Sequence, residues 1–271
     1  MKRVAAFFAA AFAVLLLYSF WWEPDSLRAR EYHLTLDAPA LKGLTIAVIA
    51  DLHAGAPYMD AAKIDAVVAA TEAARPDLIL LAGDYVSDRE DRSLRMPLDV
   101  MAEHLKGLDA PLGVYAVMGN HDDRLGPRRV RAALGQAGIL VLNNSHAVIG
   151  RAEGSVILAG IDTWFGAADG STALEGLGGQ KVLCLTHKPD IFPDLPSTCV
   201  LTIAGHTHGG QVALPLIRRL ALEYASRYGE RYGHGIVREG GKTLFVSTGI
   251  GTTTLPVRLG VPPEISLLKI Q

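Results

Sequence analysis

The sequence predicts an α/β domain whose sheets are buried on both faces, preceded by one apolar helix at the N-terminus. Short, continuous apolar runs alternate with segments whose apolar residues recur at helical spacing, which is typical of chains built from strand–helix units. Several of these apolar runs are followed directly by Asp, Asn or His. With 271 residues, of which 49% are hydrophobic, the chain can bury a sizeable core.

Residues 1–22 are expected to form a membrane anchor. The run from Val4 to Trp22 is uncharged, long enough to cross a bilayer as a helix, and ends in aromatic residues of the type found at membrane interfaces. A cleaved signal peptide and a buried core helix are the alternatives, but bulky residues after the apolar core disfavour cleavage. Lys2 and Arg3 precede the run, which favours an inner-membrane protein with the remaining domain on the periplasmic side.

The rest of the chain is interpreted as a connector followed by one domain. Residues 23–42 lead into an edge strand, and residues 43–271 carry the alternating pattern. Strands are expected at 44–50, 78–82, 113–118, 182–185, 200–204 and 243–247, with a hairpin within 146–162. Helices are expected at 60–74, 96–107 and 127–137.

Charge and cysteine content exclude some classes of protein. The formal net charge of -2 gives no sign of the basic face that nucleic-acid binders present. The two cysteines, Cys184 and Cys199, are too few for a disulfide framework. Each lies in an apolar run, so buried thiols are favoured, and a single bridge between neighbouring strands is the alternative.

Polar residues at five strand ends form the candidate site. In chain order they are Asp51 and His53, Asp84, Asn120 and His121, His187, and His206 and His208. Ligand sites in open α/β sheets form beyond the carboxyl ends of the strands, so these residues could converge on one crevice. Side chains two apart on an extended strand end point to the same side, which would let each Asp-x-His or His-x-His pair reach one ion.

The donor types favour a pair of divalent metal ions. Without His121, the set holds seven oxygen and imidazole donors and no thiolate, which suits Mn, Fe, Zn or Mg. Seven donors are too many for one closed tetrahedral site and suit two ions that share a bridging carboxylate. Two such ions, about 3.5–4 Å apart, can clamp a phosphoryl group and generate a nucleophile from water at neutral pH.

Each motif is weak alone, because an Asp after a strand is more often a cap or turn residue. As an ordered set the motifs are specific, and they are Asp51-Leu52-His53, Gly83-Asp84-Tyr85-Val86, Gly119-Asn120-His121-Asp122, Thr186-His187-Lys188 and Gly205-His206-Thr207-His208. The set resembles the calcineurin-like metallophosphoesterases over most of residues 44–250. The resemblance implies a four-layer αββα sandwich with two mixed sheets and a dinuclear metal centre.

The resemblance also implies a role for each residue. Asp51, His53 and His208 would hold the first metal, Asn120, His187 and His206 the second, and Asp84 would bridge them. His121 would face the leaving oxygen as a general acid or transition-state stabiliser, with Asp122 as its orienting partner. The implied reaction is in-line attack of a metal-bound hydroxide on a phosphoester.

The substrate is less defined. The anchor, the block GHTHGGQV and the tail STGIGTTTLPVRLGVPPEI resemble a membrane-associated bacterial subgroup that includes phosphodiesterases and a UDP-2,3-diacylglucosamine pyrophosphatase. We therefore expect a phosphodiester or pyrophosphate substrate that is lipid-linked or part of the cell envelope. A nuclease or cyclic-nucleotide phosphodiesterase of the same superfamily, and a non-catalytic scaffold, are the alternatives.

Two further features leave alternatives open. Residues 212–224 place Leu216, Leu220 and Tyr224 on one helical face, which fits a membrane-facing insertion and, as the favoured interpretation, an ordinary core-packing helix. Separately, Arg124, Arg218 or Arg258 could bind a second phosphate.

Overall fold

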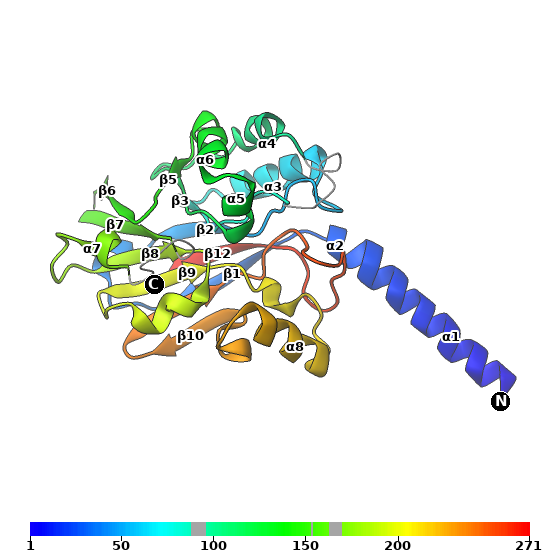
Figure 1. Cartoon of the computed structure of the whole chain (residues 1–271). Coiled ribbons are helices and arrows are strands. Elements are labelled where there is room, and N and C mark those ends of the chain that lie inside the picture. The colour runs from blue at the N-terminus through cyan, green and yellow to red at the C-terminus, as the bar shows by residue number, and fades with distance from the viewer. Residues whose placement is uncertain (88–95, 153, 163–169) are drawn as a thin grey trace.

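The computed structural model describes residues 1–87, 96–152, 154–162 and 170–271, and their strands form two six-stranded sheets (Figure 1). The first sheet has the order β1-β12-β2-β3-β4-β5 and the second β10-β11-β9-β8-β7-β6. The strands of the first sheet are β1 (Arg28–Leu34), β2 (Thr45–Ile49), β3 (Leu78–Leu81), β4 (Val114–Ala116), β5 (Leu140–Val141) and β12 (Glu264–Ile270). Those of the second are β6 (Ser145–Arg151), β7 (Gly154–Ile161), β8 (Val182–Thr186), β9 (Cys199–Ala204), β10 (Gly235–Glu239) and β11 (Lys242–Val246).

Both sheets are mixed. In the first, β2 to β5 run parallel, while β12 pairs antiparallel with β2 and parallel with β1. In the second, β7, β8, β9 and β11 run parallel, and the edge strands β6 and β10 are antiparallel to their neighbours. The two mixed sheets expected from the sequence are therefore confirmed.

Apolar residues on both faces of the central strands bind the layers together. In β2, Ile46 and Val48 pack in the core between the two sheets, whereas Ala47 and Ile49 pack on the other face. That other face is covered by α3 (Ala61–Ala73), α4 (Leu98–Leu105) and α6 (Pro127–Gln136) (Figure 1). Because successive side chains of a strand point to opposite faces, an uninterrupted apolar run is required for a strand covered on both sides.

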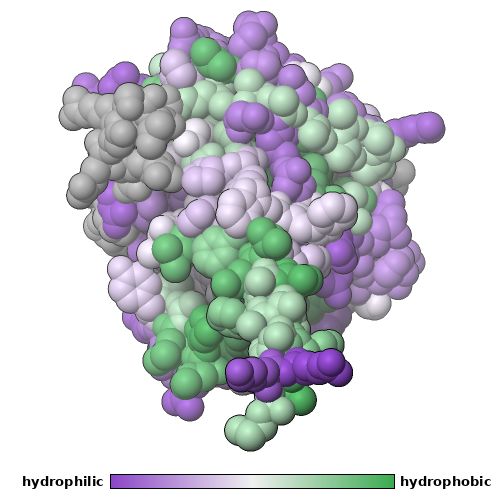
Figure 2. All heavy atoms as spheres, turned by 90° about the vertical axis from the view of Figure 1, so that its right-hand side faces the viewer, coloured by the Kyte–Doolittle hydropathy of each residue, from purple (hydrophilic) through white to green (hydrophobic). Residues whose placement is uncertain are grey.

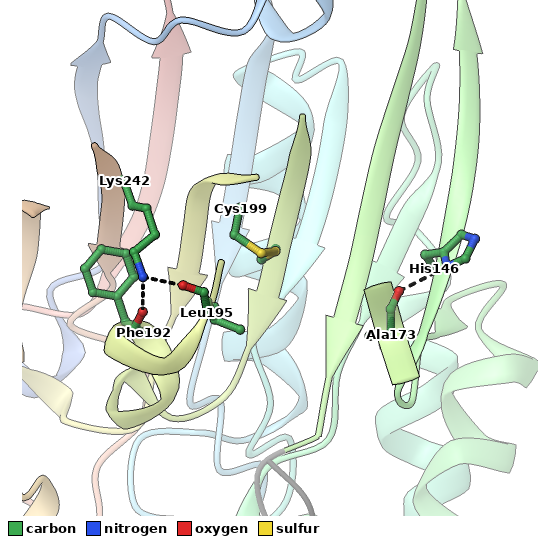
Figure 3. The surroundings of a disulfide bond; sticks show 7 residues. His146, Ala173, Phe192, Leu195, Cys199 and Lys242 are labelled. Atoms are coloured by element: carbon green, nitrogen blue, oxygen red, sulfur yellow. Dashed lines mark hydrogen bonds between the residues drawn. A yellow bond between two sulfur atoms is a disulfide. The ribbon is translucent and has the colours of Figure 1, made fainter. Parts of the chain in front are cut away.

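Short helices pack on the outer face of the second sheet, and they are α7 (Ser171–Leu174) and the 3-10 helices η4 (Pro189–Asp194) and η6 (Gly229–Tyr232). The longer helix α8 (Pro215–Ala225) packs against η6. The Lys242 amine of β11 donates hydrogen bonds to the carbonyls of Phe192 at 2.8 Å and Leu195 at 2.5 Å, which ties η4 to the sheet (Figure 3). The sandwich thus has helical layers outside both sheets.

The two cysteines form a disulfide bond. Cys184 of β8 and Cys199 of β9 lie on adjacent strands with their Cα atoms 5.7 Å apart, and both residues are fully buried (Figure 3). The expectation of two buried thiols is therefore wrong in its chemistry, although burial itself is correct. The alternative, a single bridge between neighbouring strands, is the arrangement found, because the two apolar runs form the paired strands β8 and β9.

The N-terminal helix projects from the sandwich (Figure 1). It comprises α1 (Lys2–Leu17), a π-helical segment η1 (Tyr18–Trp22) and α2 (Glu23–Asp25), and by length and composition Lys2–Asp25 can span a membrane. Its last turns are fixed to the domain, because the backbone N–H of Arg258 donates to the Ser19 carbonyl at 3.0 Å. The backbone N–H of Gly260 also donates to the Glu23 carboxylate at 2.9 Å. Directly after this helix the chain enters the edge strand β1.

Candidate metal centre

The strand ends bring the candidate residues to one edge of the sandwich. β2, β3 and β4 of the first sheet and β8 and β9 of the second each run directly into one of the five polar clusters. Backbone hydrogen bonds then join neighbouring clusters: Asp51 N–H donates to the Gly83 carbonyl at 3.0 Å, and His53 N–H donates to the Asp84 carbonyl at 3.0 Å. In the second sheet, Gly205 N–H donates to the His187 carbonyl at 3.0 Å.

Five of the candidate ligands adopt the left-handed backbone conformation. The φ angles are 53° at Asp51, 50° at His53, 57° at Asp84, 74° at His206 and 51° at His208. The alternation of an extended strand therefore does not explain how the paired residues reach the site, and that part of the sequence interpretation is wrong. Each such residue costs about 1 kcal/mol or more, and such strain persists where the surroundings impose it, as at binding sites.

The first cluster consists of Asp51, His53 and His208. All three are buried, and one ligand atom of each lies within 4.8 Å of the others. His53 Nε2 is 3.1 Å from His208 Nε2, and His208 Nε2 is 3.7 Å from Asp51 Oδ1. Two imidazole nitrogens and one carboxylate oxygen thus face a common point.

The second cluster is arranged around His187. Its Nε2 atom is 3.2 Å from Asp84 Oδ2, 3.2 Å from Asn120 Oδ1 and 3.1 Å from His206 Nδ1. Asp84 Oδ2 is also 3.8 Å from His53 Nε2, so this oxygen lies between the two clusters. The structure therefore brings all seven candidate ligands together, with Asp84 in the middle.

Carbonyl partners determine which ring nitrogens carry hydrogen. His187 Nδ1 lies 2.7 Å from the Ala82 carbonyl and His206 Nε2 lies 3.1 Å from the Ala225 carbonyl, so both nitrogens are donors. In the neutral rings, His187 Nε2 and His206 Nδ1 then direct lone pairs at each other across 3.1 Å. A cation between the two nitrogens removes this repulsion: a proton on His187 Nε2 does so without a metal, and a divalent ion bound by both nitrogens would take the place of that proton, so the residues present fit a bound metal.

The ionisation of the centre is strongly coupled. Burial alone would raise the pKa of Asp84, but His187, His53 and His121 outweigh it and hold this pKa well below its ordinary value. Burial opposes the charged form of His187, but Asp84 raises its pKa to about 9. Burial and the neighbouring His187 lower the pKa of His206 to about 3. Without a metal, Asp84 and His187 therefore form an ion pair beside neutral His206.

Two glycines make room for these carboxylates. A Cβ atom on Gly119 would lie 2.1 Å from Asp84 Oδ1, and one on Gly205 would lie 2.7 Å from Asp51 Oδ2. Any larger residue would push the carboxylate off its position. The glycines of the GNH and GHTH motifs are thus required by the close approach of the backbone to the ligands.

His121 and Asp122 occupy different sides of the Asp84 turn. The backbone N–H of His121 donates to Asp84 Oδ1 at 2.8 Å, and its ring Nε2 is 3.8 Å from Asp84 Oδ2, with 16% of the side chain exposed. Asp122 is fully buried, and its carboxylate accepts four backbone N–H groups, those of Asp84 (2.8 Å), Tyr85 (2.9 Å), Val86 (3.3 Å) and Gly119 (2.8 Å). These contacts place Asp122 under the loop that carries Asp84.

Arg258 is a structural residue that the motifs did not reveal. It is fully buried and its guanidinium donates to the carbonyls of Val261 (2.8 Å), Thr248 (3.1 Å), Gly249 (3.1 Å) and Gly251 (2.6 Å). Gly251 N–H in turn donates to the Asp51 carbonyl at 2.7 Å. The expectation that Arg258 could bind a second phosphate is wrong, because it holds the loop behind Asp51. The tail motif, conspicuous in the sequence, was the available signal for this contact.

Comparison with known proteins places this geometry in a family. The model of the calcineurin-like phosphoesterase family matches residues 44–224, which include all seven candidate ligands. The chain belongs to the calcineurin-like phosphoesterases. The family and the clustered Asp and His side chains together identify a metal-dependent phosphoesterase that uses divalent metal.

Relatives of this calcineurin-like phosphoesterase cover nearly its whole length. The metallophosphoesterase YkuE of Bacillus subtilis is 27% identical over 94% of this chain and 89% of its own. The phosphodiesterase YaeI of Escherichia coli is 30% identical over 93% of this chain and 92% of its own. Among solved structures, Haemophilus influenzae NAD nucleotidase shares the fold with a TM-score of 0.50 and 15% identity, over 76% of this chain and 45% of that chain.

Proposed function

We propose that the centre holds two divalent ions and hydrolyses a phosphodiester or pyrophosphate bond. Asp51, His53 and His208 bind one ion, and Asn120, His187 and His206 bind the other. Asp84 would be shared between them, since its Oδ2 lies 3.2 Å from His187 Nε2 and 3.8 Å from His53 Nε2. The observation that carries the proposal is the gathering of seven oxygen and imidazole donors into two clusters with Asp84 between them. Two divalent metal ions at such a centre would supply Lewis acidity and lower the pKa of bound water to near neutrality.

The residues of the chain then act around this centre. His121 has a partly exposed ring beside Asp84, and we assign it to the leaving oxygen, where it donates a proton or stabilises negative charge. Asp122 acts indirectly: by accepting the N–H groups of the Asp84 loop it fixes the position of the bridging carboxylate.

We further infer an amphiphilic, lipid-linked or cell-envelope substrate and an inner-membrane location with the domain on the periplasmic side. The apolar helix over residues 1–22 serves as the anchor, residues 23–42 as connector and edge strand, and residues 43–271 as the catalytic domain. The basic residues before the span and the Cys184–Cys199 disulfide both support export, because disulfides persist in oxidising compartments. Phosphodiesterase YaeI supports a diester as the substrate class.

Metal content tests the centre. The full chain, purified in detergent and loaded with Mn²⁺, is assayed by elemental analysis and by turnover of bis(p-nitrophenyl) phosphate. We expect two ions per chain, and Asp84→Ala should lose both ions together with turnover. Asp60→Ala is the matched control, since Asp60 caps α3 through the Lys63 N–H at 2.9 Å and is exposed. An Asp84→Ala protein that keeps two ions contradicts the bridge, and one that keeps full turnover contradicts the site.

A C-terminal alkaline phosphatase fusion to the full chain tests location. The fused enzyme should be active in intact cells, because it folds only in an oxidising compartment. An inactive but expressed fusion would place the domain in the cytoplasm.

A further inference from the structure

The helix α8 presents an apolar surface to solvent. All of α8 lies within the described part of the chain, and of its side chains Leu222 alone is buried. Leu216, Leu220 and Tyr224, predicted to share one face, are 70%, 58% and 92% exposed. The favoured sequence interpretation, a core-packing helix, is therefore wrong. Exposed apolar residues grouped on one helix, rather than scattered singly, mark an interaction surface.

Neighbouring residues extend this surface. Leu214 and Ile217 are 47% and 49% exposed, and Leu255 in the tail is 56% exposed. Figure 2 shows the face from which α1 projects, and the apolar area in its lower middle includes the side chains of α1, which points toward the viewer. We call Leu214, Leu216, Ile217, Leu220, Tyr224 and Leu255 the α8 surface.

Hydrogen bonds connect the α8 surface to the end of the N-terminal helix. The Gln211 side chain, just before α8, donates to the carbonyls of Leu255 and Val257 at 3.2 Å each. Ala213 N–H donates to the Leu259 carbonyl at 2.7 Å. The same tail segment binds Ser19 and Glu23 through the N–H groups of residues 258 and 260. Thus α8 and the span are held on one side of the sandwich by a shared segment, as seen in Figure 1.

The other end of α8 reaches the metal centre. The carbonyl of Ala225, the last residue of α8, lies 3.1 Å from His206 Nε2. Gly210, two residues after His208, packs against Arg218 and Leu222, where a Cβ atom would lie 3.1 Å from Arg218 Cγ. His206 and His121 are the partly exposed members of the centre, whereas Asp51, His53, Asp84, Asn120, His187 and His208 are buried. One helix therefore connects the apolar surface with the open side of the centre.

We propose that the α8 surface docks into the membrane that contains the N-terminal helix, and that it holds the metal centre at the level of lipid headgroups. The occupant is the bilayer itself, since a membrane begins where the span leaves the domain and α8 is tied to that point. An amphipathic helix lying in the interface buries its apolar side chains among the acyl chains and headgroups. Resting on the proposed function, this geometry makes the substrate a phosphoester whose apolar tail stays in the bilayer while its headgroup enters the centre.

Docking is tested without any assay of catalysis. The full chain is placed in nanodiscs at one copy per disc, after labelling Leu220→Cys with an environment-sensitive fluorophore. Val148→Cys is the matched control, because Val148 is 62% exposed and lies on the edge strand β6. Both native cysteines are in the disulfide and do not react. We expect blue-shifted emission at position 220, quenched by nitroxide lipids, and solvent-like emission at position 148.

Two outcomes overturn docking. Solvent-like emission at position 220 shows that the surface stays in water. The fluorophore at position 220 could instead give blue-shifted emission in concentrated detergent solution and solvent-like emission at one copy per nanodisc. This result, with no quenching by nitroxide lipids, identifies a second copy of the chain as the occupant.

Turnover tests the substrate class. The double variant Leu216→Asp, Leu220→Asp is compared with the wild type on ethyl p-nitrophenyl phosphate in solution and on hexadecyl p-nitrophenyl phosphate in vesicles. Loss of the two interfacial leucines should lower turnover of the vesicle substrate by about tenfold or more and leave turnover of the soluble substrate unchanged. Equal loss on both substrates shows that α8 merely supports the metal centre and contradicts this proposal. Lack of wild-type turnover on both substrates contradicts the proposed function instead and leaves the fluorescence result intact.

Discussion

Asp122→Asn is the change that most directly separates a role in holding the Asp84 loop from a role in orienting His121. The carboxylate accepts four backbone N–H groups, two at each oxygen. Asparagine keeps one carbonyl oxygen and replaces the other with an NH2 group, which cannot accept. Two buried N–H groups then face a donor, and since the residue is fully buried, water cannot take the place of the lost oxygen.

The magnitude follows from the bonds that are lost. A hydrogen bond to a charged group contributes about 1.5–3 kcal/mol, so losing two of them lowers the free energy of unfolding by about 3–6 kcal/mol. The bonds of Asp84 N–H and Gly119 N–H, both 2.8 Å to Oδ2, are those at stake if the amide nitrogen takes that position. Because this oxygen anchors the loop that carries Asp84, the proposed bridging ligand, metal affinity should fall as well.

Urea unfolding of the full chain in detergent, with and without Mn²⁺, measures both effects. Asp123→Asn is the control on the same helix, since Asp123 accepts no backbone hydrogen bond among the described residues. We expect a lower unfolding midpoint, lost metal and a pH profile of residual turnover with unchanged shape. A variant that keeps its stability and its metal, but whose pH profile of turnover is displaced on the acidic or basic side, would refute the loop role and favour orientation of His121.

The remaining predictions concern catalysis and stability. His121→Ala should keep metal content and lower kcat by about 10²–10⁴, and loss of metal instead would make His121 a ligand. Replacing Cys184 and Cys199 together with Ala, or reducing the bond, should lower the free energy of unfolding by about 3 kcal/mol for the sequence separation of 15; an unchanged urea midpoint would contradict the disulfide. Arg258→Lys should destabilise the chain by about 2–4 kcal/mol, because one ammonium cannot satisfy four carbonyls, and normal stability would show that the 248–251 loop does not depend on Arg258.

Much of the fold could be predicted because burial on both faces leaves a direct mark on the sequence. Strands such as Thr45–Ile49 and Leu78–Leu81 lie inside the expected runs 44–50 and 78–82. By contrast, β12 (Glu264–Ile270) lies between β1 and β2, over 200 residues away in sequence, and no local pattern encodes that partner. β1 (Arg28–Leu34) lies within the expected connector and edge-strand segment 23–42, and its start could not be located because most of its residues are exposed and form no apolar run.

The site, like the fold, could be predicted from local sequence only in part. Motif order identified the residues that gather, whereas their left-handed φ angles arise from the crowding of loops against one another and not from residue type. The contact of Ala225 with His206 uses a backbone carbonyl, which any residue at that position would offer. The burial of Arg258 was not expected, because arginine side chains are mostly solvent-exposed and the apolar neighbours Val257 and Leu259 do not reveal which carbonyls it contacts.

The hydrogen bonds of residues 258 and 260 also bear on how the enzyme can be handled. Arg258 joins the last helical turns before the domain, through Ser19, to the loop behind Asp51, through its guanidinium. Deleting residues 1–22 to obtain a water-soluble enzyme removes one end of this connection. Such a truncated protein should differ from the intact one in metal affinity and not merely in its tether. Under the proposed anchoring, changes in bilayer thickness that tilt the span would act through Ser19 and Arg258 on the loop behind Asp51.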